Sequence, residues 1–122
     1  MLTLTAACTH QAQLPAQSTA LDTQADIFPD YRDIVIPANI APLNFMVKDS
    51  GATAAVAQLQ GPNGEEVLAE ADKNMSVRID TAAWRTLLEA NRGKDISVTV
   101  YVQNAAGWVQ HKPHTLTVAQ ED

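Results

Sequence analysis

Few residues of this chain have the types and spacing that metal or acid–base chemistry requires. His111 and His114 form the only close histidine pair, and no cysteine or carboxylate lies near them in the sequence to complete a metal shell. On a regular strand, residues i and i+3 point to opposite faces, although Pro113 can bend the chain between them. We therefore predict an exposed strand end at this position, and neither a zinc nor a haem site.

The remaining candidate chemistries lack their motifs. Asp30, Asp33 and Asp49 do not follow the Asp-x-Asp-x-Asp-Gly spacing of a calcium loop. A nucleophilic triad needs a hydroxyl or thiol beside a histidine and an acid, and the three histidines suggest no such set. Glycine-rich phosphate loops and the Gly-x-Ser-x-Gly elbow do not occur. The sequence predicts a protein that is not an enzyme and that uses no cofactor and no metal.

Two aromatic residues are the candidate contacts for a ligand or partner. Tyr101 lies on the polar face of a predicted strand over 96–102, and Trp108 begins the next strand beside a turn. Exposed rings of this kind stack on sugars or hold a protein partner. The alternative is ordinary packing on the surface of a sheet.

Charge and cysteine content exclude further classes. The 122 residues include 14 acidic and 8 basic side chains, which give a net charge of −6. An acidic domain without a basic stripe is a poor partner for nucleic acid, because it cannot neutralise phosphates. The single cysteine allows no internal disulfide and no four-cysteine zinc site. No apolar run approaches the roughly 20 residues that span a bilayer.

The elements that must position these residues are mostly strands. Apolar residues alternate at period two around 43–47, 55–59, 75–79 and 96–102, with turn signals such as Gly-Pro-Asn-Gly at 61–64 between them. The pattern predicts an all-β fold, an immunoglobulin-like antiparallel β-sandwich of six to seven strands with one short helix.

The helix is predicted from a single apolar stripe. Trp84, Leu87 and Leu88 fall at i, i+3 and i+4, after Asp80 or Thr81 as the N-cap. The segment 91–93, Asn-Arg-Gly, supplies the stop. A helix of about ten residues is too short to be stable alone, so its stripe must pack on the sheets.

The first 26 residues differ in amino-acid composition from the rest of the chain. Residues 9–26 are rich in Gln, Ala, Thr and Ser, lack periodicity, and predict a flexible polar tether. Before it, residues 4–8, Leu-Thr-Ala-Ala-Cys, resemble a bacterial lipobox, which implies acylation of Cys8 and cleavage before it. Thr5 departs from the usual leucine at that position, and no basic residue precedes the apolar segment. The expected organisation is a signal remnant over 1–8, a tether over 9–26 and a β-sandwich domain over 27–120. We expect that the true start lies upstream of Met1.

A longer resemblance covers the predicted domain. The segments 28–33, 36–45, 84–93 and 97–101 resemble the N-terminal immunoglobulin-like domain of large Gram-negative lipoproteins that carry a TolB-like β-propeller. In that family the chain continues into the propeller, so this chain is expected to be an N-terminal part. The family offers no established catalytic residue to transfer onto these positions.

The resulting expectation is a non-enzymatic envelope lipoprotein module that acts as a spacer or protein-interaction domain. Its partners would be the membrane, through a lipid on Cys8, and an envelope protein or its own C-terminal propeller, and no nucleic acid. Because Thr9 and not aspartate follows the cysteine, the resemblance to lipoproteins implies the outer membrane, at its periplasmic face or at the cell surface. The alternative is a glycan- or peptide-binding module that uses Tyr101 and Trp108.

Overall fold

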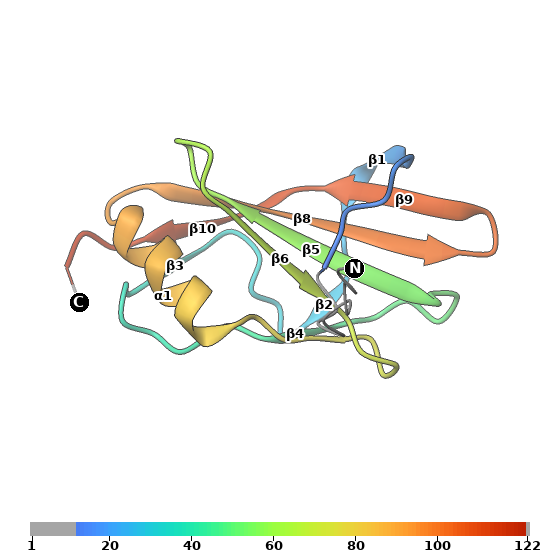
Figure 1. Ribbon diagram of the computed structural model, residues 1–122, viewed down its shortest axis with the longest axis horizontal. Coiled ribbons are helices and arrows are strands. Elements are labelled where there is room, and N and C mark those ends of the chain that lie inside the picture. Colours follow the sequence, from blue (N-terminus) through green and yellow to red (C-terminus); the bar gives the residue numbers. More distant parts are fainter. Residues whose placement is uncertain (1–11, 122) are drawn as a thin grey trace, which may run out of the picture.

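One long strand, β8 (Asp95–Asn104), lies at the centre of the larger of two sheets (Figure 1). The structure is a computed structural model that describes residues 12–121. Strand β5 (Ala54–Gln60) pairs antiparallel with β8 along most of its length. The predicted alternation explains this central position, because the aliphatic side chains at even positions of β8 all face the core.

The other side of β8 is shared by two strands. Strand β9 (Gly107–Lys112) pairs with its second half and β10 (His114–Val118) with its first half. The two form one long strand interrupted at Pro113, which has no N–H to donate to a neighbour. Three further strands complete the seven-stranded sheet, namely β6 (Glu66–Glu70) beside β5, β1 (Thr19–Gln24) beside β9 and β3 (Ile34–Ile36) beside β10.

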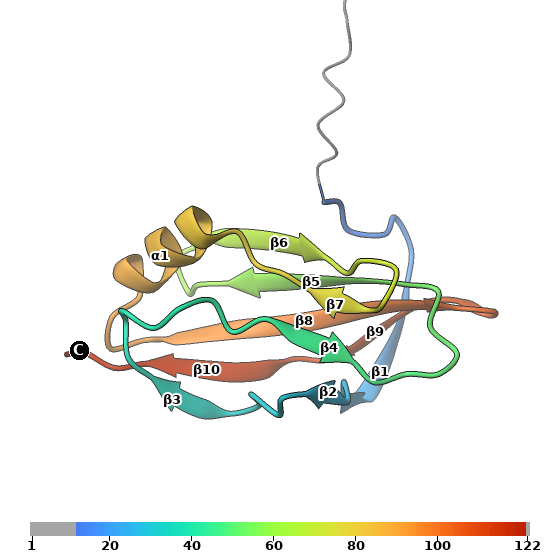
Figure 2. The same cartoon turned by 90° about the horizontal axis from the view of Figure 1, so that it is seen from below.

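The smaller sheet lies against one face of the larger one (Figure 2). Its three short strands are β2 (Ile27–Phe28), β4 (Phe45–Val47) and β7 (Ser76–Val77), which pair antiparallel in the order β2-β4-β7. The core consists of side chains from both sheets, among them Ile27, Phe45, Val47, Val77, Ala57, Leu59, Ile96, Val98, Val100 and Val102.

The helix α1 (Thr81–Ala90) closes one side of the sandwich. Asp80 is its N-cap and accepts a 2.9 Å hydrogen bond from the Ala83 N–H. The predicted stripe is confirmed, because the buried residues of the helix are Trp84, Leu87 and Leu88. The indole Nε1–H of Trp84 also donates to the Ile40 carbonyl at 2.9 Å, which ties the helix to the loop before β4. After the helix, Gly93 has a φ of +75°, as predicted for the stop.

The prediction of an all-β sandwich with one short helix is confirmed, with two differences. The described residues form ten strands and not six to seven, partly because β1 and the two-residue β2 carry no periodic apolar signal. The sandwich is also not wholly antiparallel, since β1 pairs parallel with β9 and β3 pairs parallel with β10. Both parallel strands lie at the edge of the large sheet.

The predicted domain boundary at residue 27 is wrong. Residues 19–24 were expected to belong to the flexible tether, yet they form β1 and pair with β9. The side chains of this strand are almost all exposed, so backbone hydrogen bonds and not apolar burial hold it. An edge strand of this kind gives no alternating apolar signal.

The predicted lipidation site, Cys8, lies outside the described residues, as does the whole segment 1–8. Within residues 12–121, no helix has the length and apolar character needed to cross a bilayer.

Candidate functional site

Tyr101 and Trp108 lie on the same face of the large sheet, the face turned away from the core. Tyr101 pairs with Val56 of β5, and Trp108 pairs with Gln103 of β8. Cross-strand partners share a face, and successive residues of a strand alternate between faces. Because Val100 faces the core, Tyr101 and Gln103 take the outer side together with Trp108.

Tyr101 is not the exposed ring that the sequence suggested. Its side chain is buried, with 9% of its surface exposed, and its hydroxyl donates to Gln58 Oε1 at 3.3 Å. Gln58 Nε2 in turn donates to Glu66 Oε2 at 2.7 Å. Burial raises the pKa of the Tyr101 phenol, and the Glu66 charge acts in the same direction. The tyrosine therefore acts as a packed, hydrogen-bonded part of the face and leaves no open ring for stacking.

Trp108 is the more accessible of the two rings. It is half-buried and borders two hollows in the surface, of about 630 Å³ and about 280 Å³. The larger hollow lies between the segment 16–19 and the 106–108 turn. The smaller one is lined by Gln13 together with residues of β5 and the end of β6. Residues of the segment before β1 thus line both hollows that Trp108 borders.

The three central strands of the large sheet place few charged side chains on its outer face. The residues that β5, β8 and β9 place on it by alternation are Ala54, Val56, Gln58, Gln60, Asp95, Ser97, Thr99, Tyr101, Gln103, Trp108, Gln110 and Lys112. Two of these side chains are charged, Asp95 at the start of β8 and Lys112 at the end of β9, and β6 adds Glu66 and Glu70 beside β5. Depletion of charge together with tyrosine and tryptophan is typical of the centre of a protein interface. We call this surface the neutral face.

The histidine pair differs from its prediction. His114 pairs with Val98, a core-facing residue, and only 3% of its surface is exposed. The expectation of an exposed strand end is therefore wrong for His114. The interruption at Pro113 shifts the alternation, so that His111 and His114 both point to the core side. The sequence carried a signal for this, because His114 alternates with Leu116 and Val118, which are buried.

Burial has a chemical consequence for His114. Loss of solvation lowers the pKa of the imidazole to about 4, from an ordinary value of 6.5, although the nearby Asp33 acts in the opposite direction. The ring is therefore neutral at physiological pH.

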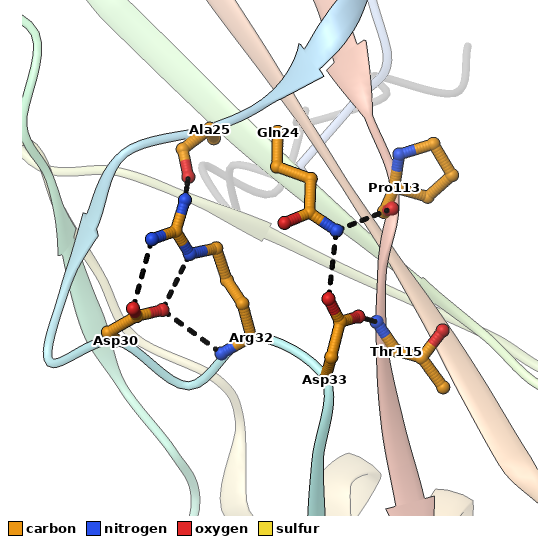
Figure 3. Close-up of polar contacts among 7 residues, drawn as sticks. All are labelled: Gln24, Ala25, Asp30, Arg32, Asp33, Pro113 and Thr115. Atoms are coloured by element: carbon orange, nitrogen blue, oxygen red, sulfur yellow. Dashed lines mark hydrogen bonds and ion pairs between the residues drawn. The ribbon is translucent and has the colours of Figure 1, made fainter.

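A polar clamp beside His114 was not predicted (Figure 3). Asp33 Oδ2 accepts from Gln24 Nε2 at 3.1 Å, and Asp33 Oδ1 accepts from the Thr115 N–H at 2.8 Å. Gln24 Nε2 also lies 3.4 Å from the carbonyl oxygen of Pro113, to which it donates. These bonds lower the pKa of the Asp33 carboxyl, the bond from Gln24 most of all. No local sequence pattern links these residues, because they come together only when β1, β3 and β10 assemble.

An ion pair between Arg32 and Asp30 lies in the loop that leads to the clamp (Figure 3). Arg32 Nε approaches Asp30 Oδ1 at 2.6 Å and Arg32 Nη2 approaches Asp30 Oδ2 at 2.9 Å. The guanidinium also donates to the Ala25 carbonyl at 3.4 Å and lowers the pKa of Asp30. Both aspartates are thus held ionised by partners within the chain, which fits a structural role.

Within residues 12–121, no group of three or more His, Cys, Asp or Glu side chains could hold a metal ion. We found no family model, no curated protein and no solved structure that matches this chain. The proposal of a function therefore rests on the surfaces described above.

Proposed function

We propose that this domain is a non-enzymatic protein-interaction module of a membrane-anchored bacterial envelope protein. The observation that carries the proposal is the neutral face, where Trp108 remains half-open beside the buried Tyr101–Gln58 pair. Surfaces of soluble proteins are normally rich in charge, and of the 14 acidic and 8 basic residues of this chain the strands β5, β8 and β9 place only Asp95 and Lys112 on this face. A face with so few charges beside an accessible tryptophan favours contact with another protein surface.

The anchoring part of the proposal comes from the sequence. The lipobox-like segment ending at Cys8 supports a lipid anchor, and Thr9 supports sorting to the outer membrane. The resemblance to propeller-bearing lipoproteins supports two partners, another envelope protein or a C-terminal propeller of the same chain. Radioactive palmitate given to cells that produce the full chain should label the wild type and not Cys8→Ser. An unlabelled wild type would rule out the anchor.

The interaction part is tested by site-specific cross-linking. A photo-reactive amino acid replaces Gln110 on the neutral face, or Ser50 in the exposed 49–51 turn as the control. In intact cells we expect a defined protein adduct from position 110 only. Adding Trp108→Ala should remove this adduct, because the substitution deletes the most accessible large ring of the face. The same adducts from both positions, or none from either, would contradict the proposal.

One observation favours a second candidate, a glycan-binding module. The hollow of about 630 Å³ beside Trp108 is lined by polar residues including Gln17, Ser18 and Thr19, and polar groups beside an indole are a common setting for a sugar ring. A glycan array separates the two candidates. Binding that is lost in Trp108→Ala would favour the glycan module, and silence across the array together with a position-110 adduct would favour protein interaction.

A further inference from the structure

A groove of about 310 Å³ lies between the edge strand β6 and the helix α1, on the far side of β5 from Trp108. Figure 2 shows the helix beside this strand. The floor of the groove is apolar and is made by Val67, Ala83 and Leu87, while Glu65 and Glu66 line the strand side.

The edge of β6 that faces this groove has no neighbouring strand, because β6 pairs with β5 alone among the described residues. The register decides which backbone groups are left over. The Gly61 N–H donates to the Glu65 carbonyl, so alternate residues of β6 from Glu65 onward bond to β5. Glu66 and Leu68 lie between them and direct their N–H and C=O groups away from β5. These groups form a template on which another strand can pair.

We propose that the free edge of β6 binds an extended segment of a partner protein by β-strand addition. The bound segment runs antiparallel to β6, places a small apolar side chain in the groove beside α1, and carries a basic residue opposite Glu66. Main-chain hydrogen bonds then provide the affinity, while the groove and the carboxylates provide the specificity.

Charge supports a basic partner. The groove lining includes two carboxylates and no lysine or arginine. Lysine and arginine offer hydrogen-bond donors and a positive charge, which complement the two carboxylates of the lining.

A second copy of this chain fits the edge less well. In an antiparallel β6–β6 pair centred on Leu68, Glu66 of each copy would stand opposite Glu70 of the other. Like charges directly opposite each other destabilise a strand pair. The same argument makes a strand with lysines at these two positions the best complement. The site uses the edge of the sheet on the far side of β5 from Trp108, and the Glu66–Gln58 hydrogen bond links it to the neutral face.

The probe is an acetylated and amidated peptide, Lys-Val-Thr-Val-Lys, titrated into the isotope-labelled full chain. In the proposed register its threonine faces Leu68 and its lysines face Glu66 and Glu70. We expect amide shifts at Glu66, Leu68 and the helix side of the groove. Two control peptides, one with glutamates in place of lysines and one with an N-methylated threonine, should bind about tenfold more weakly or worse. The first loses charge complementarity and the second loses an N–H that would pair with Leu68.

Two substitutions test the site from the protein side. Glu66→Lys should reverse the preference between the lysine and glutamate peptides, whereas Asp22→Lys, an equal charge change on β1, should leave the preference unchanged. Thr86→Trp fills the groove and should weaken the lysine peptide about tenfold, whereas Arg85→Trp on the same helix should not. If the Glu66→Lys variant fails to fold, the Thr86→Trp variant still tests whether the peptide binds in the groove.

Three outcomes would overturn the proposal. The first is the absence of shifts at Glu66 and Leu68 with the lysine peptide at about 1 mM. The second is equal binding of all three peptides. The third is a concentration-dependent shift of Leu68 without peptide, which would assign the edge to a second copy of the chain.

Discussion

The Thr115 N–H donates a 2.8 Å hydrogen bond to Asp33 Oδ1, which fastens the residue before β3 to the start of β10. The other oxygen of the same carboxylate accepts from Gln24 at the end of β1. One side chain thus joins two edge strands that pair parallel with the β9–β10 strand. Asp33 adopts a φ of +58°, a left-handed conformation that aspartate and asparagine tolerate better than most residues.

Asp33→Ala should therefore destabilise the domain more than Asp33→Asn. The alanine variant loses both hydrogen bonds and keeps the strained φ, whereas asparagine retains an acceptor oxygen for Thr115 and tolerates the left-handed conformation. Chemical denaturation gives the order of stability, and hydrogen exchange at the Thr115 amide reports the bond directly. Equal stability of the two variants, with unchanged exchange at Thr115, would show that the clamp contributes nothing.

The burial of His114 predicts a stability that depends on pH. Because the folded-state pKa is about 4 and the ordinary value is 6.5, the unfolded chain binds a proton in this range and the folded chain does not. Stability is therefore complete above about pH 6.5 and falls as the pH drops toward 4, by about 3 kcal/mol in total. Asp30, Arg32 and Asp33 are the charged groups that face the ring.

The measurement is the free energy of unfolding between pH 4 and 7. His114→Leu should flatten its slope against pH, since leucine is apolar and does not titrate. His111→Gln is the matched control for the loss of an imidazole on the same side of the β9–β10 strand. A slope that is unchanged in His114→Leu, or equally reduced in both variants, would assign the pH dependence to other groups.

Replacing Trp84 with a smaller residue should lower the stability of the domain strongly. Its side chain is fully buried, and its Nε1–H donates to the Ile40 carbonyl at 2.9 Å. Trp84→Phe removes the donor and leaves a gap, so the expected cost is about 2–4 kcal/mol. Arg85→Ala, on the exposed side of the same helix, is the control and should change stability by less than about 0.5 kcal/mol. A thermal midpoint for Trp84→Phe as high as that of the control would mean that the core closes around the smaller ring.

Two N-terminal truncations, one that keeps β1 and one that removes it, measure what this strand contributes to stability. A chain that begins at residue 19 keeps β1 and the Gln24 bonds, and should unfold at nearly the same denaturant concentration as the full chain. A chain that begins at residue 25 loses β1, exposes the edge of β9 and removes Gln24 from Asp33. We expect the second chain to be clearly less stable and more prone to associate. Equal unfolding midpoints would show that β1 adds no stability.

Sequence patterns predicted the elements that bury a continuous apolar stripe. The alternation in 96–102 and the Trp84, Leu87 and Leu88 stripe both fixed the core-facing side correctly. The same apolar patterns gave wrong predictions where the structure does not depend on the alternation of apolar side chains. Strand β1 is held by backbone pairing, so composition alone assigned it to a tether. Tyr101 lies on the polar side of its strand yet is buried, because Gln58 and other neighbours cover it.

By itself, the sequence determined the all-β class and the helix with its cap, because each depends on spacing within one segment. The tertiary structure decided three things that depend on segments far apart in the chain. It buried His114 beside Asp33, it placed the free edge of β6 next to α1, and it left Trp108 as the open ring of the neutral face. Periodicity reports which side of an element is apolar, and only the assembled fold determines what covers the other side.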